Sequence, residues 1–135
     1  MRRCLRAIVM LAFLLGVLTS MTSGAAREIT FWVMPNAPQD THTEWLDSRI
    51  EEFRKETGIT VHYEIVGWGD AWNRLVAAIT SGEGADVVQV GTTWNPQLAA
   101  MKGLAKLDVA EFGGAGAFMN ANYESATYKG AEYGV

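Results

Sequence analysis

A short valine-rich run over residues 86–91 (Asp-Val-Val-Gln-Val-Gly) constrains the fold of this chain more than any other stretch. A glycine-rich turn precedes the run, and Asn95 and Pro96 follow it. Because Asn can cap the free backbone N–H groups of a helix and Pro suits the first helical position, the run predicts a buried strand that leads into a helix. In open α/β sheets ligands bind at this junction, which here holds residues 92–94.

Strands and helices also alternate before this run. Residues 28–33 are β-branched and aromatic, which predicts a first strand. Thr41 and Glu44 are spaced as a capping box, so we expect a first helix to begin there. Gly58 is placed to end that helix, because glycine readily adopts the left-handed conformation that closes a helix.

A second strand and a second helix follow. Residues 60–66 alternate between apolar and polar side chains, which is typical of a strand with one covered face. We expect the second helix to begin at Asp70 and to end at Gly82. Strands that alternate with helices of about 10 to 15 residues predict a parallel sheet with right-handed crossovers, and therefore an α/β fold.

The first 26 residues have the layout of a secretory signal peptide. Three arginines precede an uncharged run over residues 7–18, and small residues precede a cleavage point after Ala26. A membrane anchor is the alternative, but the run is shorter than the roughly 20 residues that a spanning helix needs. Because Cys4 lies before the run, it cannot be the lipid-modified first residue of a mature lipoprotein. We expect export to the periplasm.

The charge balance excludes several classes of partner. Without residues 1–26 the chain keeps eight basic and fifteen acidic residues, which gives a net charge of −7. Such a balance argues against a surface for nucleic acid or an anionic membrane. Residues 27–135 also contain no cysteine, so neither disulfides nor thiolate chemistry contribute there.

Six short stretches, taken in order, resemble the first lobe of an extracellular solute-binding protein of a sugar-importing ATP-binding cassette transporter. No single stretch is specific; the resemblance lies in their order over residues 28–108. Where the family usually has Pro before the Asp of the third strand, this chain has Ala85, which loosens the turn but touches no ligand group. The stretches are residues 29–32, 53–61, 68–72, 81–89, 91–94 and 103–108.

The resemblance implies a two-lobed receptor with a periplasmic-binding-protein-like (type II) fold. Such a receptor closes on a sugar or oligosaccharide and delivers it to the permease subunits of the transporter in the membrane. It works as a monomer, without a cofactor and without catalysing a reaction. Residues 27–135 would then form the N-terminal, incomplete part of the first lobe.

Right-handed crossovers place three strand-to-helix loops at one edge of the predicted sheet. Sugar rings expose faces of C–H groups and edges of hydroxyls, so a sugar site needs flat aromatic surfaces and short polar side chains. The three loops carry both kinds. The candidate ligand-binding residues are Asn36, Trp68, Asp70, Thr92, Thr93 and Trp94.

Each candidate also has a purely structural interpretation. Asp70 could serve only to cap the second helix, and Asn36, between two prolines, could be only a turn residue. The two threonines could satisfy loop backbone groups, and the two tryptophans could cover the edge of the sheet. We assign the remaining tryptophans, Trp32, Trp45 and Trp72, to the core because of their predicted strand and helix positions.

Enzyme motifs are absent from the sequence. It contains no nucleophile elbow, no P-loop and no G-x-G-x-x-G motif between a strand and a helix, so we expect no catalytic residues. His42 and His62 have no cysteine or paired carboxylate at ligand spacing, so we expect no metal. The competing hypothesis is a fragment of a secreted α/β enzyme, either a hydrolase or a flavodoxin-like protein.

The end of the sequence is less regular. Residues 110–122 are rich in Gly and Ala and predict either a loose helix or a loop. Residues 133–135 (Tyr-Gly-Val) are typical of the opening of a strand. A sheet that stops at the first residues of a strand favours a truncated chain over a complete small domain.

Overall fold

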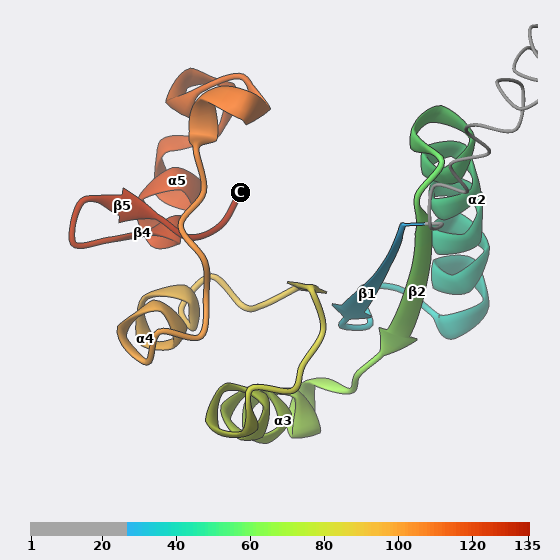
Figure 1. The fold of residues 1–135 in the computed structure, drawn as a ribbon, viewed down its shortest axis with the longest axis horizontal. Coiled ribbons are helices and arrows are strands. Elements are labelled where there is room, and N and C mark those ends of the chain that lie inside the picture. The colour runs from blue at the N-terminus through green and yellow to red at the C-terminus, as the bar shows by residue number, and fades with distance from the viewer. Residues whose placement is uncertain (1–26) are drawn as a thin grey trace, which may run out of the picture.

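The computed structural model describes residues 27–135; the predicted signal peptide, residues 1–26, lies outside the described residues. Elements are labelled as in Figure 1. In chain order they are β1 (Glu28–Val33), α2 (Gln39–Thr57), β2 (Thr60–Ile65), α3 (Trp68–Ser81), β3 (Val87–Val88), α4 (Asn95–Ala100), the 3-10 helices η1 (Val109–Phe112) and η2 (Ala115–Ala117), α5 (Asn120–Ala126), β4 (Thr127–Tyr128) and β5 (Ala131–Glu132).

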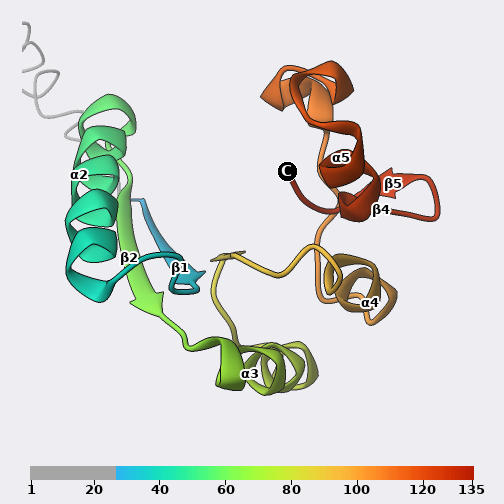
Figure 2. The same cartoon turned by 180° about the vertical axis from the view of Figure 1, so that it is seen from behind.

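The first three strands form a parallel sheet in the order β2-β1-β3. β1 pairs with β2 along six residues, from Glu28 opposite Thr60 to Val33 opposite Ile65. α2 lies beside β2, whereas α4, α5 and the β4–β5 hairpin lie beyond β3, as Figure 2 shows from behind. The prediction of an α/β fold with a parallel sheet is therefore confirmed.

The third strand is shorter and more exposed than the sequence predicts. Only Val87 and Val88 pair with β1, opposite Phe31 and Trp32, and Val87 remains 48% exposed. β3 is an edge strand of the described sheet, so one of its sides has no partner strand. The predicted strand within residues 86–91 is confirmed at Val87–Val88, but its predicted length and burial are wrong, because burial depends on neighbours that the run itself does not specify.

The ends of the two long helices agree with the predictions, and their beginnings do not. Gly58 and Gly82 end α2 and α3 in the left-handed conformation, with φ of 71° and 75°. α2 begins before Thr41, because the carbonyl of Pro38 already accepts the N–H of His42 in the first turn. The predicted capping box is therefore wrong, and Thr41 lies within the helix.

α3 and α4 also begin without side-chain caps. The carbonyl of Gly67 accepts the N–H of Asp70, so α3 begins two residues before Asp70, whose side chain makes no capping bond. α4 has Pro96 in its first turn as predicted, but Asn95 is a helical residue with no capping bond. Trp94 already has helical dihedral angles and occupies the capping position, because the turn from Gly91 continues directly into the helix.

The hydrophobic core contains residues that precede β3 in the sequence and one, Leu98, that follows it. Its fully or nearly fully buried members are Met34, Val66, Ala71, Leu75 and Leu98. Trp32 and Trp72 pack against this cluster, as expected, whereas Trp45 is 59% exposed and its assignment to the core is wrong. On α2 the neighbouring Leu46 is the residue that is buried, and one position along a helix turns a side chain by about 100°.

The last residues form a hairpin instead of the opening of a sheet strand. β4 and β5 are antiparallel, and Lys129 and Gly130 between them both have positive φ, as a type I′ hairpin turn requires. Residues 133–135 lie outside any strand, so that prediction is wrong. Among residues 27–135, no helix combines the length and the apolarity that crossing a membrane requires.

Candidate functional site

The loops that follow β1, β2 and β3 are joined by aromatic contacts. The indole N–H of Trp68, at the start of α3, donates to the carbonyl oxygen of Pro35, 2.9 Å away, in the loop after β1. The Trp68 ring also meets the ring of Trp94, in the loop after β3, at a centroid distance of 5.8 Å. The three loops thus meet at the carboxyl edge of the sheet, as the sequence predicts.

Trp94 lies between two tryptophans of α3. Its ring makes edge-type contacts with Trp68 at an interplanar angle of 72° and with Trp72 at 68°, the latter at 5.5 Å between centroids. Trp94 is partly buried against the hydrophobic core, whereas Trp68 is 42% exposed. A Cβ on Gly91 would lie 3.7–3.8 Å from these two rings, so the backbone there is in close reach of both.

Four polar candidates are exposed on the same three loops or at the start of the adjoining helix. Asn36 follows Pro35, and Asp70 lies in the first turn of α3 without capping it. Thr92 and Thr93 form the turn between β3 and α4. Of the six predicted residues, the structure therefore brings Trp68 and Trp94 into direct contact. The other four are exposed on the loops that this contact joins or in the first turn of α3.

One residue that positions these loops was not identified from the sequence. Gln89 Oε1 accepts the backbone N–H of Met34 at 3.0 Å, which connects the end of β3 to the end of β1. The sequence does contain a sign of this role, since Gln89 is a polar residue that interrupts the valines at positions 87, 88 and 90. A buried polar side chain in such a run usually has a hydrogen-bond partner.

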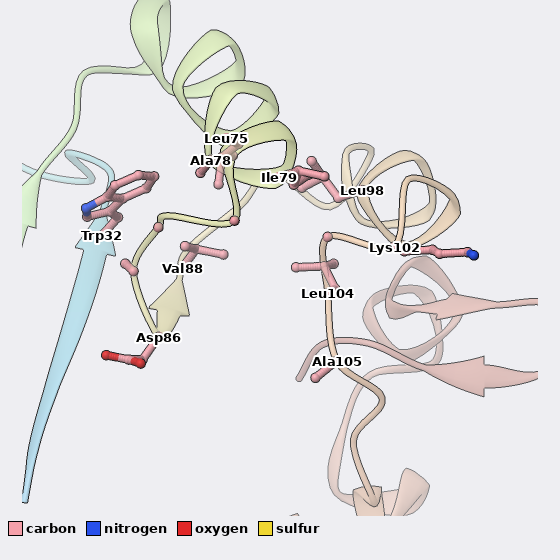
Figure 3. Close-up of a pocket in the computed structure, with 14 residues that line it drawn as sticks. Trp32, Leu75, Ala78, Ile79, Asp86, Val88, Leu98, Lys102, Leu104 and Ala105 are labelled. Carbon is pink, nitrogen blue, oxygen red and sulfur yellow. The ribbon is translucent and has the colours of Figure 1, made fainter.

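Two hollows flank β3, and of the six candidate residues Thr92 alone lines one of them, the second. The first, of about 350 Å³, lies between α3 and residues 102–105, and its lining combines apolar side chains such as Leu75 and Ile79 with the charged Asp86 and Lys102 (Figure 3). The second, of about 510 Å³, lies between β3 and the C-terminal residues and includes Asn95, which is 5% exposed. Trp68 and Trp94 line neither hollow.

Charged groups near the sheet have structural partners. Asp86 accepts the backbone N–H and the hydroxyl of Thr30, both at 2.8 Å, and these hydrogen bonds lower the pKa of Asp86. Arg74 pairs with Glu64 through both of its terminal nitrogens, which lowers the pKa of Glu64, and lies 4.2 Å above the Trp32 ring. Among residues 27–135, no group of three or more potential ligand side chains could hold a metal ion.

Comparison with known proteins identifies relatives of one kind. The model of the family described as bacterial extracellular solute-binding protein matches residues 39–131. The curated diacetylchitobiose binding protein DasA of Streptomyces coelicolor is 30% identical over 83 residues, which cover 62% of this chain and 19% of that protein.

Solved structures agree. A solute-binding protein from Thermotoga lettingae with bound α-D-tagatose has a TM-score of 0.68 and 24% identity over 81% of this chain and 28% of its own. A periplasmic solute-binding protein from Pectobacterium atrosepticum has a TM-score of 0.64 and 27% identity, and the match covers 81% of this chain and 27% of that protein. The fold is thus the type II fold of periplasmic sugar-binding proteins, of which this chain spans somewhat more than a quarter.

Proposed function

This chain belongs to the bacterial extracellular solute-binding protein family, and we propose that it binds a sugar or oligosaccharide as the substrate-binding component of an ATP-binding cassette transporter. DasA is named for diacetylchitobiose, and the Thermotoga protein holds tagatose. The ligands of both proteins are carbohydrates, and this supports the proposal that the ligand of this chain is also a carbohydrate. The chain spans 19% of DasA. The sugar contacts that we propose are those made by residues 27–135. We also propose that the protein delivers its sugar to a permease in the membrane.

The observation that carries the proposal is the aromatic contact at the carboxyl edge of the sheet. Trp68 and Trp94 are in contact, and Trp68 keeps 42% of its surface exposed. Aromatic faces pack well against the C–H face of a sugar ring, and short polar side chains nearby can bond its hydroxyls. The polar side chains in question are Asn36, Asp70, Thr92 and Thr93.

The remaining parts of the proposal concern setting and mode of action. The chain acts in the periplasm after export, as a monomer, and binds its ligand without turnover. Without residues 1–26 its net charge is −7, which argues against nucleic acid as a partner. The six candidate residues offer surfaces and hydrogen-bonding groups for a ligand, and they do not form a set of nucleophile, base and orienting group.

Saturation-transfer NMR on the whole chain tests this function. The probes are maltotriose, diacetylchitobiose and D-tagatose, followed for an hour at 25 °C. We expect transfer to ring protons of at least one sugar, with a dissociation constant no better than about 1 mM, equivalent to roughly −4 kcal/mol, because an open edge covers only part of a ring. The sugar should remain intact.

Two results would overturn the proposal. Absence of transfer to all three sugars would remove the carbohydrate function, and cleavage of any of them would favour the enzyme alternative. Trp45→Ala is the matched control, since Trp45 is exposed on α2, outside the three loops. That variant should bind sugar as the unmodified chain does.

A further inference from the structure

We infer that the two tryptophans at the carboxyl edge have different roles. Trp68 offers the ring face on which a sugar stacks, and Trp94 is a positioning residue that holds the Trp68 ring in place. This inference rests on the proposed carbohydrate function and assigns roles within the same site. It also distinguishes two residues that the sequence alone treats alike.

Exposure separates the two side chains. Trp68 is 42% exposed, although its neighbour Ala71 on α3 is fully buried. Trp94 belongs to the partly buried side chains that pack against the core cluster containing Leu75 and Leu98. A ligand in solution therefore has more access to Trp68 than to Trp94.

Two different contacts fix the orientation of the Trp68 ring. Its polar edge is held by the hydrogen bond from the indole N–H to the carbonyl of Pro35. Its apolar part meets the ring of Trp94 at 5.8 Å and 72°. Because the indole N–H is already bonded, the exposed part of the ring is apolar. A ring held this way before binding loses little side-chain freedom when a ligand stacks on it.

Trp94 is in turn held from two sides. Trp68 and Trp72 are four residues apart on α3 and thus lie on one face of that helix. Both contact the Trp94 ring, at 5.8 and 5.5 Å. Loss of the Trp94 ring would leave the Trp68 ring with the Pro35 hydrogen bond as its fixed contact, and the ring could then rotate about that bond.

The chemistry of an apolar ring surface limits the ligand. Stacking on Trp68 requires a sugar face made of C–H groups, and a pyranose with equatorial hydroxyls has such a face. The hydroxyls then point outward in the plane of the ring. Asn36 and Thr93 are exposed on two of the loops that the aromatic pair joins, and they are the polar side chains expected to meet these hydroxyls.

Fluorine NMR of the whole chain labelled with 5-fluorotryptophan tests the division of roles. The sequence contains five tryptophans, and single Trp→Phe variants assign their resonances. On titration with maltotriose, and separately with diacetylchitobiose, we expect the Trp68 resonance to shift most and the Trp45 resonance to stay in place. Trp68→Ala should weaken binding at least tenfold.

Variants of Trp94 show whether it acts through Trp68. Without sugar, Trp94→Ala should already shift or broaden the Trp68 resonance, and it should weaken binding. Trp94→Phe keeps an aromatic ring at this position and should recover most of both effects, which also guards against a Trp94→Ala variant that fails to fold. Trp45→Ala should change neither measurement.

The outcomes separate this inference from the function on which it rests. If neither sugar, nor D-tagatose in the same titration, shifts any resonance of the unmodified chain, the proposed function fails and the inference fails with it. If a sugar binds but Trp68→Ala binds it as tightly as the unmodified chain does, only the division of roles is overturned. A sugar-induced shift of Trp94 that leaves Trp68 in place would have the same consequence.

Discussion

Residues 28–81 and residues 101–135 differ in how regular their structure is. The first region has two strands of six residues and helices of 19 and 14 residues, whereas the second has two 3-10 helices, a helix of seven residues and strands of two. All members of the buried core cluster lie between Met34 and Leu98. The comparison indicates that regular elements extend where apolar partners are available on the neighbouring element.

The largest expected effect is on core packing. Leu98 is fully buried in the cluster that α4 shares with the first region, so Leu98→Ala should lower the free energy of unfolding by about 2 to 5 kcal/mol. Phe112→Ala, in the second region, removes a side chain that is 46% exposed and should cost less than half as much. Urea unfolding measures both. Equal losses would show that the two regions share one core.

An intermediate loss of stability is expected when the glycine that ends a helix is substituted. Gly58 ends α2 at φ of +71°, where a residue with a Cβ is strained, so Gly58→Ala should cost about 1 to 2 kcal/mol of unfolding free energy. Gly116 in η2 has open space around it and no positive φ. Gly116→Ala should therefore change stability by less than about 0.5 kcal/mol, because it mainly restricts the unfolded chain. Thermal unfolding of the two variants gives the comparison, and a larger loss for Gly116→Ala would contradict it.

The smallest expected effect is a pH dependence at the contact between β1 and β3. The backbone N–H of Thr30, and then its hydroxyl, lower the pKa of Asp86 in the folded chain. The stabilisation is therefore fully present above the unfolded pKa near 4 and is lost as the pH falls through the lower folded value. The urea concentration at the midpoint of unfolding should therefore decrease when the pH is lowered from 5 to 3.

Asp86→Asn isolates this contribution from other carboxylates, because asparagine does not titrate. The variant should lose less of its stability over the same pH range than the unmodified chain does. Two other carboxyl groups with lowered pKa values, Glu51 and Glu64, remain in both proteins and thus cancel in the difference. Identical pH profiles would mean that the hydrogen bonds to Thr30 do not persist in solution.

The sequence predicted those parts of the fold that local signals determine. β1 has the predicted bounds, and Gly58 and Gly82 end their helices, because apolar periodicity and a left-handed glycine act within a few residues. The extent of β3 and the exposure of Trp45 depend on which elements pack nearby, and no local pattern contains that information.

The candidate site was predictable to a similar degree. Parallel strands place their following loops at one edge, so the location of the site followed from the strand and helix pattern. The hydrogen bond from Trp68 to Pro35 and the bond from Met34 to Gln89 join residues more than 30 positions apart in the sequence. Their pairing depends on the three-dimensional arrangement of the loops, and so does the difference in exposure between Trp68 and Trp94.

Amide chemical-shift mapping of the whole chain during titration with maltotriose tests the central claim most directly. If the carboxyl edge of the sheet is the sugar site, the largest shifts will occur in residues 34–38, 66–70 and 90–94, and residues 109–135 will be nearly unaffected. Shifts centred on residues 102–105, beside the hollow in Figure 3, would place the ligand elsewhere and contradict this account.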